Sequence, residues 1–188
     1  TIKASGVAGE TYVRVLVTRG VGELTYDPGA TPVPSVVIIV KPHVDPAAEV
    51  YEKGVHAVIC DIVRNHPGSV NPMIKSNNLM NSALAMQEAI RRGGYEAVMR
   101  NFRGELTECA VANLFIVRGD TVLTPPLSAG LLPGITREYL FELGRREGVL
   151  RGIGLRLPAG FRVPYYLLLG LFFLYPLALV PFLGDPHG

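Results

Sequence analysis

The sequence predicts an α+β fold, and three observations carry that prediction. Short runs of β-branched and aromatic residues, typical of strands, occur along most of the chain. Two longer segments have the apolar spacing or the end signals of helices. The strands do not alternate regularly with helices, which argues against a series of βαβ units.

Three strands are expected in the first third of the chain. Residues 12–20 are rich in β-branched side chains and roughly alternate in polarity. A loop rich in Pro and Gly follows at 27–34. Residues 36–40 then form a continuous apolar run between prolines, which predicts a buried strand. Residues 56–63 have the composition of a third strand.

A helix is expected over residues 77–92, immediately after Lys75. Its apolar residues recur at spacings of three and four, which predicts a single stripe facing the core. Two arginines and two glycines close the segment, as expected at a helix C-terminus. The predicted stripe consists of Leu79, Ala83, Met86 and Ile90.

The second half of the chain predicts more strands and one more helix. The helix is expected from Thr136 to about residue 147, because an acidic residue lies in its first turn, arginines in its last turn and a glycine just beyond. The strands are expected at residues 95–100, 106–108 and 113–118 and, after a hairpin turn, at 121–124.

The composition indicates a globular protein and argues against several classes of function. Hydrophobic residues make up 48% of the chain, and the net charge is +2. No basic stripe with interleaved aromatic residues is present, so nucleic-acid binding is not expected. Cys60 and Cys109 form no disulfide framework, which favours the reducing cytoplasm. The four histidines show no metal-ligand spacing, so no metal site is predicted.

Lys75 is the first residue that suggests chemistry. It follows Ile74 and comes directly before the predicted core helix. A lysine that is partly desolvated has a lowered pKa, and its neutral amine can attack a carbonyl group. The alternative is a solvated lysine at a helix start.

Glu108 is the second candidate, within a run of small and apolar residues. An unpaired carboxylate in such surroundings is costly, and a protonated pyridine nitrogen would be a suitable partner. An exposed strand glutamate is the alternative.

The third candidate is the start of the second predicted helix, after Pro133. Backbone N–H groups and the positive end of the helix dipole form an anion site there, and Gly134 permits a phosphate to approach closely. An ordinary helix with Thr136 as its N-cap is the alternative.

Together these segments resemble the class IV, or fold-type IV, pyridoxal-phosphate-dependent aminotransferases. The resemblance rests on IKSNNLMNSALAMQEA, then LTECAVANLF, then LPGITRE, and covers about residues 11–149. The family includes branched-chain aminotransferases, D-amino-acid aminotransferases and aminodeoxychorismate lyases. The resemblance implies a two-domain α+β fold, a homodimer and the cofactor pyridoxal 5′-phosphate.

The resemblance also implies roles for individual residues. Lys75 would bond covalently to the cofactor and shuttle a proton during the reaction. Glu108 would pair with the pyridine nitrogen, and Leu131 or Leu132 would pack near the ring. The phosphate would be held at Gly134, Ile135 and Thr136.

Tyr12 and Arg14 bear on the substrate, because they match a Tyr-x-Arg that faces the substrate site in branched-chain enzymes. A half-buried strand tyrosine is the alternative for Tyr12, and Thr18-Arg19-Gly20 resembles the D-amino-acid and lyase branches. We expect transfer of an amino group from a branched-chain L-amino acid to 2-oxoglutarate. A lyase that eliminates pyruvate, and an inactive remnant, are the alternatives.

The resemblance divides the chain at residues 34 and 149. Residues 1–34 would end a small N-terminal domain that is largely missing, together with the interdomain segment, and residues 35–149 would form most of the large cofactor-binding domain. Residues 150–188 contain no Lys, Glu, Ser, Thr, Asn or Gln. We interpret this apolar tail as an altered reading frame. A membrane anchor over 163–183 is less favoured, because three prolines interrupt it.

Overall fold

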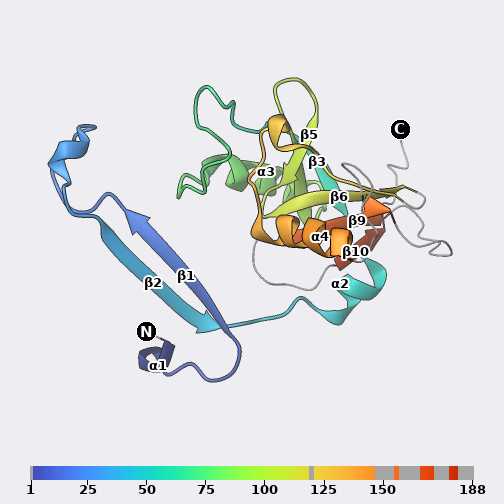
Figure 1. Cartoon of the computed structure of the whole chain (residues 1–188), viewed down its shortest axis with the longest axis horizontal. Helices are drawn as coiled ribbons and strands as arrows, with labels where there is room; N and C mark the ends of the chain where they lie inside the picture. The colour runs from blue at the N-terminus through green and yellow to red at the C-terminus, as the bar shows by residue number, and fades with distance from the viewer. Residues whose placement is uncertain (1, 119–120, 147–154, 157–165, 172–177, 182–188) are drawn as a thin grey trace. The chain divides into compact units, whose positions relative to one another are not determined.

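The computed structural model describes residues 2–118, 121–146, 155–156, 166–171 and 178–181. The chain divides into two compact units, Thr1–Pro46 and Ala47–Gly188 (Figure 1). The first unit therefore ends later than residue 34, because the strand that follows the Pro- and Gly-rich loop pairs back onto the first strand.

The first unit is a two-stranded antiparallel ribbon. Strand β1 (Thr11–Thr18) pairs along its whole length with β2 (Ser35–Pro42). The short helix α1 (Ile2–Ser5) precedes the ribbon, and the 3₁₀ turn η1 (Pro28–Ala30) lies in the connection between the two strands. Both strands were expected from the sequence, and the structure confirms them.

The expected burial of β2 is wrong. Its Val36, Val37, Ile38 and Ile39 side chains are between 42% and 60% exposed. An apolar run is buried only where other elements cover the strand, and β2 has β1 as its one sheet neighbour among the described residues.

The second unit is built on a mixed sheet with the strand order β10-β9-β6-β5-β4-β3, and β7 pairs with β6 and β8. Only β3 and β4 are parallel among the described pairs, and helix α3 connects them. This arrangement confirms the α+β class. The unit contains α2 (Ala48–Lys53), β3 (Ala57–Val63), α3 (Met80–Arg91), β4 (Glu96–Arg100), β5 (Leu106–Cys109), β6 (Ala112–Arg118), β7 (Thr121–Leu123), η2 (Leu127–Ala129), α4 (Ile135–Arg146), β8 (Leu155–Arg156), β9 (Tyr166–Leu171) and β10 (Ala178–Pro181).

The core of the second unit has two clusters, which share strand β4. One cluster joins helix α3 to β3 and β4, and the other joins β4 to β5 and β6. Ala97 and Met99 belong to the first cluster and Val98 to the second, as expected from the alternation of side chains along a strand. Strand β4 is therefore buried on both faces.

The predicted apolar stripe of α3 is wrong in its residues. The buried positions are Ala85 and Ala89, whereas Leu79 and Ile90 are 48% and 64% exposed. Small side chains let the helix backbone approach the sheet closely, and the Cys60 thiol lies 3.3 Å from the Ala85 carbonyl oxygen. The helix also begins at Met80 rather than directly after Lys75, so Lys75 lies in the preceding loop.

Only the strands β8, β9 and β10 of the tail lie within the described residues. Strand β9 pairs with β6, and β10 pairs with β9. None of the helices in the described part of the chain combines the length and apolarity needed to cross a membrane. The predicted hairpin turn at 119–120 and the predicted helix end at 147 lie outside the described residues. The altered reading frame stays a prediction.

Candidate active site

The carboxylate of Glu108 is the centre of a buried polar network in the second unit. Glu108 lies on β5 and is 2% exposed. Its Oε1 pairs with Nη2 of Arg64 at 2.7 Å. Its Oε2 accepts hydrogen bonds from the backbone N–H of Leu132 at 3.1 Å and from Nδ2 of Asn113 at 3.5 Å. These contacts use three of the roughly four lone-pair positions of a carboxylate.

Arg64 reaches Glu108 from the end of β3. Its Nη2 also lies 3.5 Å from the Pro72 carbonyl oxygen, and its Nη1 lies 3.3 Å from Oδ1 of Asn81. Pro72 precedes Lys75 in the loop, and Asn81 lies in the first turn of α3. The guanidinium therefore joins the carboxylate to both sides of the lysine-bearing loop.

Lys75 is exposed, but its charge reaches the buried network. Its ammonium is among the groups that lower the pKa of Glu108. The loop that leads to α4 also lies against the lysine loop, because a Cβ built on Gly130 would be 3.4 Å from Cγ of Pro72. Gly130 has a φ of +91°, which favours glycine. The structure therefore brings the lysine and glutamate segments together.

Burial dominates the electrostatics of Glu108. Removal of the carboxylate from water raises the pKa of Glu108 from 4.5 to about 7, while the charge of Arg64 and the N–H of Leu132 act in the opposite direction. The expected costly, buried carboxylate is confirmed, but it has an arginine partner in the chain itself.

The start of α4 is tied to the same network. Leu132 donates its N–H to Glu108 and accepts a hydrogen bond from Nδ2 of Asn113 at 3.1 Å. Gly134 is buried, and its carbonyl oxygen accepts from the N–H of Glu138, so the helix begins directly after Gly134. Thr136 is consequently inside the first turn and is not the N-cap. The side chain of Ile135 is 89% exposed.

Tyr12 and Arg14 are placed in the other unit, on β1, where both are half-buried. The ammonium of Lys41 lies over the Tyr12 ring, 4.9 Å from its centroid. Their role in substrate binding stays a prediction.

Two residues of this site were missed by the sequence analysis. Asn113 lies directly opposite Glu108 in the β5–β6 pair, so the short connection between the two strands could have predicted their contact. Arg64 was not expected in the site from the sequence. Nothing in the local sequence distinguishes Arg64, because the partners of its side chain come from three separate segments.

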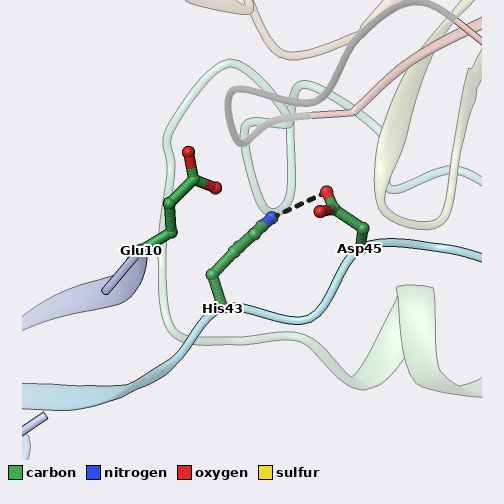
Figure 2. A group of neighbouring side chains, drawn as sticks. All are labelled: Glu10, His43 and Asp45. Atoms are coloured by element: carbon green, nitrogen blue, oxygen red, sulfur yellow. Dashed lines mark hydrogen bonds and ion pairs between the residues drawn. The ribbon is translucent and has the colours of Figure 1, made fainter. Parts of the chain in front are cut away.

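A second group of polar side chains lies in the first unit. Glu10, His43 and Asp45 have possible ligand atoms that all lie within 4.8 Å of one another, which the histidine spacing did not predict (Figure 2). They meet because the paired ends of β1 and β2 bring Glu10 beside His43. Nε2 of His43 already lies 3.2 Å from Oδ1 of Asp45, and Asp45 is 68% exposed, so we assign no metal to this group.

Comparison with known families decides the identity of the chain. The model of the family "Amino-transferase class IV" matches residues 1–152. The chain belongs to the class IV aminotransferases. The motifs that carry Lys75, Glu108 and the start of α4 all lie inside the matched region.

Individual class IV aminotransferases support this assignment. The putative branched-chain-amino-acid aminotransferase of Methanocaldococcus jannaschii is 35% identical over 140 residues, which are 74% of this chain and 48% of that protein. The structure of the branched-chain aminotransferase from Thermoproteus uzoniensis with norvaline matches with a TM-score of 0.79 and 26% identity, over 96% of this chain and 59% of that one. The Escherichia coli enzyme matches with a TM-score of 0.77 and 26% identity, over 90% and 56%. The chain thus spans about half the length of these relatives.

Proposed function

We propose that the chain carries the cofactor-binding part of a pyridoxal-phosphate-dependent transaminase, which moves an amino group from a branched-chain L-amino acid to 2-oxoglutarate. The observation that carries this proposal is the network in which Glu108 joins the lysine loop to the start of α4. The resemblance between this chain and branched-chain enzymes supports the substrate class. The family resemblance also implies a homodimer, and two cysteines without a disulfide framework favour the cytoplasm.

The residues present fit pyridoxal phosphate at each of its three polar ends. Lys75 offers an amine to the aldehyde, and Glu108 retains one acceptor position on Oε1 for a protonated ring nitrogen. The first turn of α4 offers backbone N–H groups and the positive end of the helix dipole to the phosphate. When bound, the cofactor acts as an electron sink for the carbanion at the substrate Cα.

Each residue then has a defined task. Nζ of Lys75 would hold the cofactor covalently and would take the proton from the substrate Cα. Glu108 would keep the ring nitrogen protonated, because a carboxylate next to that nitrogen stabilises its protonated form. Leu132 fixes Glu108 through its N–H, and Gly134 and Thr136 would flank the phosphate at the start of α4. Tyr12 and Arg14 would contact the substrate.

Borohydride reduction of the 188-residue chain in the presence of the cofactor tests the proposal. We expect a stable adduct on Lys75, located by peptide mass spectrometry, because reduction traps the imine that this amine forms with the aldehyde. Lys75→Arg should abolish the adduct while keeping a positive charge near Glu108. Lys53→Arg, an exposed lysine of α2 in the same unit, is the matched control and should leave the adduct intact. An adduct on another amine, or none at all, contradicts the proposal.

Product analysis separates the transaminase from the lyase. Leucine, isoleucine or valine with 2-oxoglutarate should yield glutamate, whereas a lyase would release pyruvate from its own substrate. The branched-chain enzymes among the similar proteins favour the first outcome. Pyruvate release without glutamate formation would show that the substrate assignment is wrong even if Lys75 carries the cofactor.

A further inference from the structure

We propose that Arg64 is a positioning residue of the cofactor site, which holds the ionised Glu108 and the Lys75 loop in one fixed arrangement. This inference rests on the proposed function and adds to it a residue outside the three segments that carry the resemblance. It gives Arg64 two separable tasks, one through its charge and one through its forked shape.

The charge of Arg64 acts on Glu108. The two groups are 2.7 Å apart, and their side chains are 13% and 2% exposed, so water screens the pair weakly. An opposite charge at this distance favours the ionised form of a carboxyl group, and burial opposes it. The ionised carboxylate accepts a hydrogen bond from the protonated ring nitrogen, and its negative charge stabilises the positive charge of that ring. Arg64 therefore lowers the pH above which Glu108 is ready to bind the cofactor.

The shape of Arg64 acts on the loop. One guanidinium contacts Glu108, the Pro72 carbonyl oxygen and Oδ1 of Asn81. A planar guanidinium presents several donors in fixed directions, whereas a lysine ammonium is a single flexible point charge. The segment between Pro72 and Asn81 contains Lys75, so these contacts constrain its position from both ends. Asn81 in turn donates from Nδ2 to the Val63 carbonyl oxygen at 2.8 Å, next to Arg64 in sequence.

Stability alone is a poor explanation for this pair. A buried ion pair is often no more stabilising than apolar residues of the same volume, because both charges lose their water. Nε of Arg64 is buried and has no acceptor within the described residues, which adds to the cost. An arrangement that contributes little to stability but aligns two reactive groups is expected where the site needs a defined geometry.

The charge task is measured directly in the cofactor-free 188-residue chain. The titration of Glu108 is followed by NMR of chain labelled with ¹³C-glutamate, with the signal assigned by its absence in Glu108→Gln. We expect Arg64→Gln to move the titration midpoint upward by about one pH unit or more. Arg103→Gln is the matched control. Arg103 forms the other short arginine–glutamate pair near β5, at 2.6 Å to the exposed Glu105, and its loss should leave the Glu108 midpoint unchanged.

The shape task is measured with Arg64→Lys. This variant keeps a charge near Glu108, so its midpoint should stay closer to wild type than that of Arg64→Gln. It should nevertheless retain the cofactor less tightly than wild type, as measured by the visible absorbance of the lysine-bound cofactor during dialysis, because an ammonium cannot serve all three partners. Circular dichroism verifies that each variant is folded. If Arg64→Gln does not fold, Arg64→Met replaces it in the charge measurement, and Arg64→Lys decides the shape task through cofactor retention.

The outcomes separate this inference from the proposed function. A Lys75 adduct in wild type with an unchanged Glu108 midpoint in Arg64→Gln overturns the charge task. Equal cofactor retention in wild type and Arg64→Lys overturns the shape task. The absence of any Lys75 adduct in wild type overturns the proposed function instead, whatever Arg64 does to Glu108.

Discussion

Strands β2 and β6 have similar apolar compositions but opposite surroundings. In β2, the run from Val36 to Ile39 is between 42% and 60% exposed. In β6, Leu114 and Phe115 are completely buried. Strand β6 lies inside a sheet, between β5 and β9, whereas β2 pairs only with β1 in the described part of its unit. Composition therefore predicts a strand in both places but predicts its burial in only one.

The two strands should differ most in how much stability is lost when one of their side chains is truncated to alanine. Leu114→Ala should lower the free energy of unfolding by about 2–5 kcal/mol, because it removes a fully buried side chain and leaves a cavity. Ile38→Ala on β2 is the matched control and should cost far less, since its side chain is 42% exposed. Urea denaturation followed by circular dichroism measures both values. Equal losses would show that β2 is covered in solution.

The same contrast explains which parts of the fold were predictable. Local signals located β1, β3, β4, β5 and β6, because alternation and β-branched residues are properties of a strand itself. Burial depends on neighbours that are distant in sequence, and so β2 was wrongly expected to be buried. The stripe of α3 failed for a related reason. Spacing found an apolar face, but close packing against the sheet required the small residues Ala85 and Ala89.

The site was predictable to the extent that each residue belongs to a local motif. Lys75, Glu108 and the start of α4 each have a recognisable sequence context, and the structure brings their segments together. Arg64 has no such context, because its function arises from contacts with Glu108, Pro72 and Asn81 that only the folded chain brings into reach.

The second expected effect is the pH dependence that a buried carboxyl group gives to stability. Glu96 at the start of β4 is 2% exposed, and burial raises its pKa from 4.5 to about 7, although the N–H groups of Ala97 and Ala110 oppose this shift. The folded chain then binds a proton more tightly than the unfolded chain. The contribution of Glu96 to stability is therefore greatest below pH 4.5 and falls as the pH rises through 7, by about 3 kcal/mol at 1.36 kcal/mol per pKa unit.

Glu96→Gln tests this pH dependence, because it removes the titrating group with little change in size. We expect the free energy of unfolding to fall less between pH 5 and pH 8 in this variant than in wild type. Glu108→Gln should flatten the remaining fall, since burial also raises the pKa of Glu108 to about 7. Glu23→Gln, an exposed residue of the first unit, is the control. An unchanged pH dependence in Glu96→Gln would show that its carboxyl group is hydrated in solution.

The smallest effect on stability is expected from polar substitutions on the ribbon. Val36→Lys replaces a 60% exposed valine, and surface substitutions usually change stability by less than about 0.5 kcal/mol. Its effect should appear in association instead, because exposed apolar strands pair with other chains and a lysine on such a strand prevents this. Light scattering at increasing protein concentration should show less association for Val36→Lys than for wild type.

Thr18→Lys, a polar exposed position on β1, controls for the added charge. If both variants reduce association equally, net charge is responsible. If only Val36→Lys does so, the apolar surface of β2 is the contact, and the ribbon differs from the core sheet in its neighbours among the described residues rather than in its composition.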